Sequence, residues 1–246
     1  MLIIETIDLR KLTTLPIKEF TNGFEVRWDN TLLVTRYQQK QTLVLTRYGQ
    51  LIVLNQSLKK VLDRFSEVAG IHYYEMRCLY QMITERTLGY VAGNYALVPT
   101  CGRTNPAVVY FMNHYLDNYC FDEEADAVLA TFKGKKREMI RVIIDTNMKT
   151  FRRMRRAAHD VGTIHLSSLE NLCRHYGARK GDVTGMVRKS AGYNWRQHRQ
   201  HHESMIFQIM AQTVAAAAMQ AYGENFNANF YHVLFDRYHQ SNCRNS

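Results

Sequence analysis

The chain has 246 residues, with 32 Lys and Arg against 22 Asp and Glu, so its formal net charge at pH 7 is +10. Hydrophobic residues make up 46% of it and only three are proline, which excludes a disordered chain and leaves ample material for a core. The five scattered cysteines form no Cys-x-x-Cys pair, which favours reduced thiols in a cytosol over a secreted disulfide framework. The start of the sequence lacks the features of a signal peptide. We therefore expect a cytoplasmic protein.

The first part of the chain is rich in Val, Leu, Thr and aromatic residues between short polar turns, which predicts strands over residues 24–28, 31–37 and 42–54. Within it, LLVTRYQQ at 32–39 matches LVLTRYGQ at 43–50 in five of eight positions. A period of eleven residues suits successive strands of a meander. Arg36 and Arg47 would then occupy equivalent places on neighbouring strands, where they either extend a basic surface or are simply exposed.

Two helices are expected next. Ser57 precedes apolar residues at helical spacing and Gly70 follows them, which predicts a capped helix over residues 57–70. A second helix is expected over about residues 73–86.

Strands then resume over residues 94–99 and 108–119. The acidic residues that follow predict a turn; they are Asp122, Glu123, Glu124 and Asp126. Residues 127–132 and 138–144 predict a hairpin with Gly134 at its tip.

Residues 133–156 carry most of the excess positive charge, with ten basic residues against two acids, Glu138 and Asp145. The second half of this segment predicts a helix that is capped by Asp145 and ends at Gly162. At about 100° per residue, one face of the helix is cationic and the opposite face is apolar. The cationic face holds Lys149, Arg152, Arg153 and Arg156. The apolar face holds Met148, Phe151, Met154, Ala158 and Val161.

The remainder reads as helical, with helices expected over residues 166–177, within 194–222, and over 227–240. Residues 204–223 carry no charge, but three glutamines at multiples of four (Gln208, Gln212, Gln220) favour an amphipathic core or oligomer helix over a membrane span. The expected fold is therefore α+β. An N-terminal antiparallel sheet with flanking helices occupies residues 1–162, and a C-terminal helical extension, a possible oligomerisation element, occupies residues 163–246.

The residues that could support catalysis or bind a metal form no convincing pattern. His198 and His202 have the i,i+4 spacing of zinc helices, with His201 and Glu203 beside them, but neighbouring arginines would repel a cation. Cys173 and His175 point different ways on a helix. Cys101 lies in a loop beside Arg103, a position that could face an anion. No phosphate-binding loop, dinucleotide fingerprint or nucleophile elbow is present. We therefore expect no catalytic residues, no metal and no cofactor.

The clustered positive charge favours a polyanionic partner, because each neutralised phosphate releases condensed counterions. The alternative is a solvated surface helix, which is what most charged helix faces are.

Residues 94–156 show a characteristic order of elements. An apolar strand ending in Pro-Thr (ALVPT, 96–100) is followed by a polar stretch (CGRTNP, 101–106) and an aromatic strand with a His element (VVYFMNHYL, 108–116). A strand–Gly turn–strand hairpin (128–140) and a basic helix (MKTFRRMRRAA, 148–158) complete the pattern. This pattern resembles the ComK family of competence transcription factors of Gram-positive bacteria.

The resemblance implies a nucleoid-associated transcriptional activator of DNA-uptake genes. Such a protein would bind paired AT-rich boxes on double-stranded DNA, as a dimer or higher oligomer, largely through the minor groove, under the control of a proteolytic adaptor. Inserted arginines suit the narrow minor groove of AT tracts. The expected DNA-binding residues are Arg103, Lys133, Lys135, Lys136, Arg137, Arg141, Lys149, Arg152, Arg153, Arg155 and Arg156. Two other classes stay open: a nucleic-acid enzyme such as a nuclease or recombinase subunit, and a basic module that binds an acidic protein.

Overall fold

The computed structural model describes residues 3–135 and 138–175, together with the isolated residues 211, 212, 214, 215, 219 and 233. The chain divides into two compact units, residues 1–168 and 169–245. The helices expected beyond residue 176, including the uncharged segment 204–223, lie almost wholly outside the described residues. The fold described below is that of the first unit.

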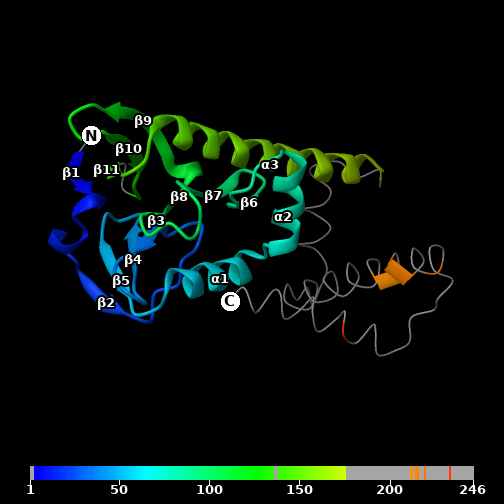
Figure 1. Ribbon diagram of the computed structural model, residues 1–246, viewed down its shortest axis with the longest axis horizontal. Coiled ribbons are helices and arrows are strands. Elements are labelled where there is room, and N and C mark those ends of the chain that lie inside the picture. The colour runs from blue at the N-terminus through cyan, green and yellow to red at the C-terminus, as the bar shows by residue number, and fades with distance from the viewer. Residues whose placement is uncertain are drawn as a thin grey trace. The chain divides into compact units, whose positions relative to one another are not determined.

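The fold class is α+β, as the sequence predicted, and its strands form two sheets (Figure 1). Sheet A has the strand order β1-β11-β10-β9 and sheet B has the order β2-β5-β4-β3-β8-β7-β6. The strands of sheet A are β1 (Ile3–Asp8), β9 (Leu116–Asp122), β10 (Ala127–Lys133) and β11 (Met139–Ile144). Those of sheet B are β2 (Glu19–Thr21), β3 (Thr31–Arg36), β4 (Thr42–Thr46), β5 (Leu51–Leu54), β6 (Tyr90–Ala92), β7 (Tyr95–Pro99) and β8 (Val109–Met112).

Most neighbouring strands are antiparallel, and two predicted local pairings are confirmed. β10 and β11 form the hairpin, and the repeated segments contribute the successive antiparallel strands β3 and β4. Two edge strands pair in parallel, β1 with β11 and β2 with β5. These parallel pairs join segments far apart in the chain, so local sequence patterns could not indicate them.

Three strand predictions were wrong. The single strand expected over 42–54 is divided into β4 and β5 by a turn, in which Gly49 N donates to Thr46 O at 3.0 Å. Residues 24–28 are not a strand, because Asn30 turns the chain there: its Oδ1 accepts from Arg27 N at 2.9 Å and its Nδ2 donates to Glu25 O at 2.8 Å. The single strand expected over 108–119 is divided by a 3-10 turn, η2 (Asn113–Tyr115), into β8 in sheet B and β9 in sheet A. A second such turn, η1 (Leu9–Thr14), follows β1.

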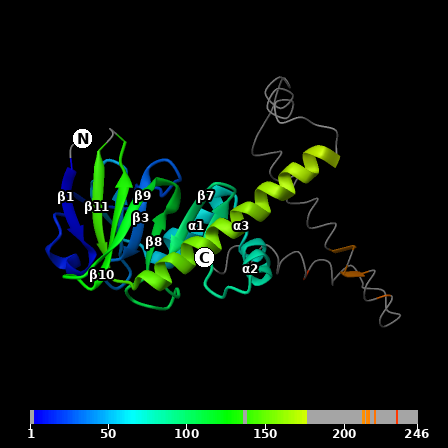
Figure 2. The ribbon, with the colours of Figure 1, turned by 90° about the horizontal axis from the view of Figure 1, so that it is seen from above.

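Both faces of sheet B are buried. One face meets sheet A and the helices α2 (Tyr73–Met82) and α3 (Met148–His175), while the other meets α1 (Leu58–Ala69). Figure 1 shows α1 and α3 on opposite sides of sheet B, and Figure 2 shows α3 crossing β8 and β7. Burial on both faces explains why β4, with the sequence TLVLT, has no exposed residue.

The boundaries of α1 were predicted correctly. Ser57 Oγ accepts from Lys60 N at 3.3 Å, and Gly70 adopts the left-handed conformation that ends the helix. The expected end of the basic helix at Gly162 was wrong, because α3 continues to His175 and includes the segment expected as a separate helix from 166. Gly162 is instead a packing residue, since a Cβ there would lie 2.4 Å from Gly93 O. α3 continues through residue 162, where the sequence predicted a domain boundary, and that boundary stays a prediction.

Candidate nucleic-acid interface

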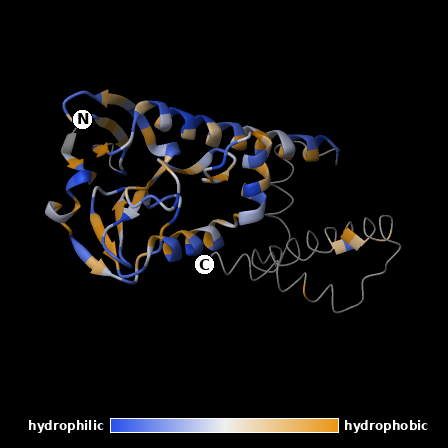
Figure 3. Ribbon diagram, viewed as in Figure 1, coloured by the Kyte–Doolittle hydropathy of each residue, from blue (hydrophilic) through white to orange (hydrophobic). Residues whose placement is uncertain are grey.

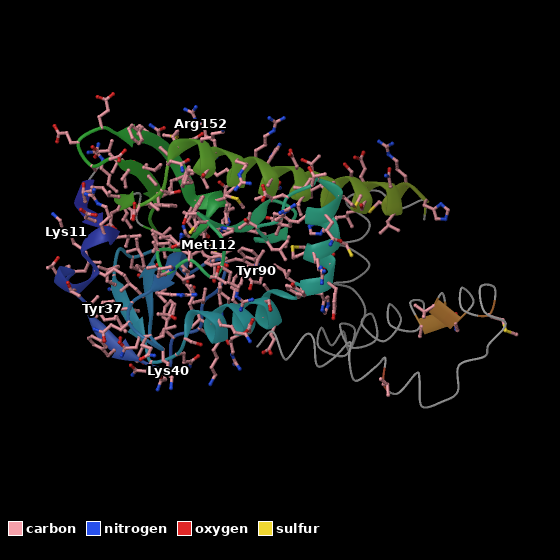
Figure 4. All side chains as sticks on the ribbon, in the orientation of Figure 1. Lys11, Tyr37, Lys40, Tyr90, Met112 and Arg152 are labelled. Carbon is pink, nitrogen blue, oxygen red and sulfur yellow. The ribbon has the colours of Figure 1, made fainter. Side chains whose placement is uncertain are left out.

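The amphipathic character predicted for the first half of α3 is confirmed. Phe151, Met154, Ala158 and Val161 are buried, whereas Lys149, Arg152 and Arg156 are exposed. The Phe151 ring stacks on Phe111 of β8, with the ring centroids 4.8 Å apart and an angle of 13° between the planes. Hydrophilic and hydrophobic residues alternate along α3 (Figure 3), and Arg152 lies on its outer side (Figure 4).

We call Lys149, Arg152 and Arg156 the α3 cation face. Within the described part of the chain, these three side chains form no ion pair with a carboxylate. They are carried by the first turns of a helix whose first turn contains no acid. A lysine at the positive end of the helix dipole costs stability, about 0.3–1 kcal/mol, and the dipole adds to its attraction for an anion.

The residue that caps α3 is Asn147 and not Asp145, so this prediction was wrong. Asn147 Oδ1 accepts a hydrogen bond from Thr150 N at 2.7 Å. Asp145 follows the last residue of β11, two residues before Asn147, and is exposed. The helix begins at Met148, and a capping side chain has to precede the first helical residue directly.

The two other arginines at the start of α3 attach the helix to the body of the protein. Arg153 forms an ion pair with Glu85 at 3.0 Å, and the Glu85 side chain is only 9% exposed. Arg155 Nε donates to Asn113 Oδ1 at 2.8 Å, and its guanidinium lies 4.6 Å from the centroid of the Tyr119 ring. Both side chains therefore have partners within the protein, which sets them apart from the α3 cation face.

The basic residues of the β10–β11 hairpin lie apart from α3. Lys133 forms an ion pair with Asp117 at 2.8 Å, and Lys135 Nζ lies 4.9 Å from the Tyr48 ring centroid. Arg141 is exposed on β11, whereas Lys136 and Arg137 lie outside the described residues.

β11 runs from the hairpin tip to the segment that begins α3 (Figure 2). Its six residues span roughly 17 Å at the usual rise per residue of a strand. The described cations of residues 133–156 therefore form two groups rather than one continuous surface.

Arg103 lies in the loop after β7 and is held there by contacts on both sides. Its guanidinium is 3.4 Å from the Asp63 carboxylate, and its carbonyl accepts from Arg36 Nη2 at 2.9 Å. Burial raises the pKa of the Asp63 carboxyl to about 6, and the charge of Arg103 partly offsets this effect. Arg103 would have to leave Asp63 before it could enter a DNA groove.

Arg36 and Arg47 do not extend one basic surface. β3 and β4 are antiparallel, with Arg36 opposite Thr42 and Thr31 opposite Thr46, so the two arginines lie at opposite ends of the pair. The sequence repeat predicted the meander correctly, but equivalent positions in an antiparallel pair do not lie side by side.

Cys101 lies in a loop, as expected. Burial raises the pKa of its thiol, which disfavours a reactive thiolate there.

Within the described residues, no three His, Cys, Asp or Glu side chains are grouped so that they could hold a metal, and no helix is long and apolar enough to cross a membrane. The histidines at 198, 201 and 202 and Glu203 lie outside these residues. No protein-family model, no curated protein and no solved structure matches this chain.

The sequence interpretation missed a group of residues at the tip of the β10–β11 hairpin. Arg47 packs over the ring of Tyr115, 4.1 Å from its centroid, and its carbonyl accepts from Lys135 N at 2.8 Å. Tyr48 lies under Lys135. The repeated Thr-Arg-Tyr triplet could have indicated this group, because each repeat places a tyrosine next to its arginine, but only the arginines entered the prediction.

Proposed function

We propose that this protein is a transcriptional regulator that binds double-stranded DNA and holds the phosphate backbone with the α3 cation face. One observation carries the proposal: Lys149, Arg152 and Arg156 are exposed on a helix whose opposite face is buried. Such a helix is rigidly placed, so its cations can meet a regular array of phosphates. Contacts of this kind position a protein on DNA without reading its bases.

The resemblance to the ComK family extends the proposal. It supports activation of DNA-uptake genes from paired AT-rich boxes, binding as a homodimer, a place on the nucleoid in the cytoplasm, and control by a proteolytic adaptor. It also supports a non-enzymatic role. Arg141 and the cations of the β10–β11 hairpin are the further side chains proposed to contact DNA. Arg103 is proposed as a reader of the minor groove once it has separated from Asp63.

The test compares three proteins by fluorescence anisotropy on AT-box and GC-rich duplexes. The first is the wild type, the second carries Lys149→Ala, Arg152→Ala and Arg156→Ala, and the third carries Lys11→Ala, Lys18→Ala and Arg77→Ala. The second and third lose the same charge from exposed positions, and only the second loses it from the α3 cation face. Arg153 is left intact because its replacement would break the pair with the buried Glu85.

We expect the α3 variant to lose most of its duplex affinity at about 100 mM salt and the control variant to retain most of it, with both proteins folded by circular dichroism. Equal affinities in the two variants would show that α3 does not hold the duplex. Cleavage of the duplex on addition of Mg²⁺ would favour a nuclease. Binding that any acidic polymer abolishes equally, whatever the DNA composition, would favour a module for an acidic protein.

A further inference from the structure

A second surface crosses one end of sheet B, and the strand register explains how it is assembled. β3 begins opposite the end of β4, because Thr31 pairs with Thr46. β8 ends opposite the start of β7, because Met112 pairs with Leu97. The β4–β5 turn, the residues before β3, the η2 turn and the start of β7 are therefore brought to the same end of the sheet.

Each of these segments contributes an aromatic side chain, and two contribute a ring held against a cation. We call the set Tyr48, Tyr115, Tyr95 and Trp28, with Arg47 and Lys135, the aromatic row. Lys135 Nζ lies 4.9 Å from the Tyr48 ring centroid, and the Arg47 guanidinium lies 4.1 Å from that of Tyr115. Lys135 N also donates to Arg47 O at 2.8 Å, which fixes the hairpin tip against the β4–β5 turn.

His114 connects the two halves of the row. Its ring lies 4.2 Å from that of Tyr115 and 5.0 Å from that of Tyr95, measured between centroids. Tyr95 in turn stacks on Trp28 at 5.7 Å, with 27° between the planes. Burial lowers the pKa of His114, so it is neutral at pH 7 and serves as a spacer rather than a charge.

The rings at both ends of the row remain open to solvent. Tyr48 is 46% exposed and Tyr95 is 50% exposed, so a large part of each ring does not contribute to the core. Rings left open beside cations have the composition of surfaces that bind unpaired nucleic acid, in which bases stack on aromatic side chains and phosphates meet the basic groups. Asp29, next to Trp28, is also exposed, and its backbone carbonyl accepts a hydrogen bond from Arg47 Nη1 at 3.2 Å. Arg47 Nη1 also donates to the Tyr115 hydroxyl at 3.0 Å, so Arg47 is held within the protein and Lys135 is the more exposed of the two cations.

We propose that the aromatic row binds an unpaired nucleic-acid strand by stacking bases on Tyr48 and Tyr95 and by pairing a phosphate with Lys135, the exposed cation of the row. A neutral ligand such as a sugar would use the rings and leave Lys135 without an anion, whereas a nucleic-acid strand uses both. This site is separate from the α3 cation face and does not depend on duplex binding there.

The test uses the full-length protein and three fluorescently labelled probes of one length: oligo(dT), an abasic oligomer with the same phosphates and no bases, and a duplex. The variants are Tyr48→Ala and Tyr95→Ala, with Tyr48→Phe and Tyr95→Phe as ring-preserving counterparts. Tyr74→Ala in α2 is the matched control, because Tyr74 is also exposed, at 40%, and lies outside the row.

We expect wild type to bind oligo(dT) more tightly than the abasic oligomer, and each alanine variant to lose roughly five- to a hundredfold in affinity for oligo(dT). The phenylalanine variants and Tyr74→Ala should keep wild-type affinity. Equal binding of oligo(dT) and the abasic oligomer by wild type would overturn the proposal, as would equal losses in the alanine and phenylalanine variants.

Trp28 provides a measurement that does not depend on the stability of the alanine variants. In a Trp195→Phe background, which removes the other tryptophan of the chain, we expect oligo(dT) to quench Trp28 emission and the abasic oligomer not to do so. Unchanged emission with saturating oligo(dT) would contradict stacking at the Trp28–Tyr95 end. If the α3 variant loses duplex binding while oligo(dT) still quenches its Trp28 emission, the two sites are separate. If the wild type does not bind a duplex at all, the quenching by oligo(dT) still tests the aromatic row.

Discussion

Gly162 allows α3 to approach sheet B more closely than any other residue could. In the middle of a helix, replacement of glycine by alanine ordinarily stabilises a protein by about 1 kcal/mol. Here the added Cβ would lie 2.4 Å from the carbonyl oxygen of Gly93, in the turn between β6 and β7. Because the obstructing atom belongs to the backbone, the helix or the turn would have to shift.

We therefore expect Gly162→Ala to lower the free energy of unfolding, by about 1–3 kcal/mol, against its helix propensity. Urea denaturation followed by circular dichroism measures this change. Thr163→Ala, at the next and exposed position of α3, is the control and should change stability little. Stabilisation by Gly162→Ala would show that the turn yields to the helix.

Asp63 makes a pH-dependent contribution to stability. Burial raises its pKa to about 6 in the folded protein, above the value of about 4 expected in the unfolded chain. The folded state therefore retains the proton more strongly, so the contribution of Asp63 is fully present below about pH 4 and is lost as the pH rises through 6. Arg103 offsets part of this loss.

Asp63→Asn removes that titration. The difference in unfolding free energy, variant minus wild type, should rise by about 2 kcal/mol between pH 4 and pH 7.5. Carboxylates whose pKa is lowered, such as Glu25 beside Arg27 and Arg64, are present in both proteins. Their pH-dependent contributions to the unfolding free energy therefore cancel in this difference. A difference that does not vary with pH would mean that Asp63 is not protonated in the acidic range.

At the scale of the elements, the start of α3 offers a direct comparison of two capping candidates. Asn147 Oδ1 accepts from Thr150 N, whereas Asp145 is too far from the helix start to do so. Asn147→Ala should cost about 1 kcal/mol of unfolding free energy, and Asp145→Ala should cost much less. Equal costs, measured by urea denaturation, would restore Asp145 as a capping residue.

Local patterns predicted some elements because those elements depend on neighbours in sequence. The capped helix α1, the β10–β11 hairpin, the β3–β4 pair and the apolar stripe of α3 all follow from short spacings. Helix α3 was predicted to be too short because Gly162 was interpreted as a terminator, although the atom that requires a glycine lies in the distant Gly93.

The division of residues 108–119 between two sheets could not be predicted from their own pattern. η2 is held by distant partners: His114 Nε2 lies 3.1 Å from Trp28 O, and Tyr115 packs against Arg47. The candidate sites could not be predicted for the same reason, because their residues contact partners that are far away in the sequence. The pairing of Arg153 with Glu85, of Arg103 with Asp63 and of Lys135 with Tyr48 depends on how the sheets pack, and it decides which cations are available to a ligand.

At the scale of the whole molecule, the arrangement of charge sets the salt dependence of DNA binding. The ten basic residues of segment 133–156 could meet one duplex together only if they formed one surface, but their described cations lie in two groups. A duplex held by the α3 cation face alone meets three cations per chain, so log K against log salt should have a slope of roughly −3, or about twice that for a dimer. Titrations between 50 and 200 mM salt measure this slope, and a salt-independent affinity would contradict phosphate binding.

The parallel pairing of β1 with β11 has a consequence for synthesis on the ribosome. Ile3 and Ile4 pair with Met139 and Ile140, so β1 is made long before β11, its neighbour in sheet A, exists. At typical translation rates the delay is on the order of ten seconds. During that time the backbone hydrogen-bonding groups of β1 have no partner strand, and other nascent chains can pair with them. We therefore expect yield to depend on the speed of elongation and on chaperones that shield N-terminal segments, even where the finished protein is stable.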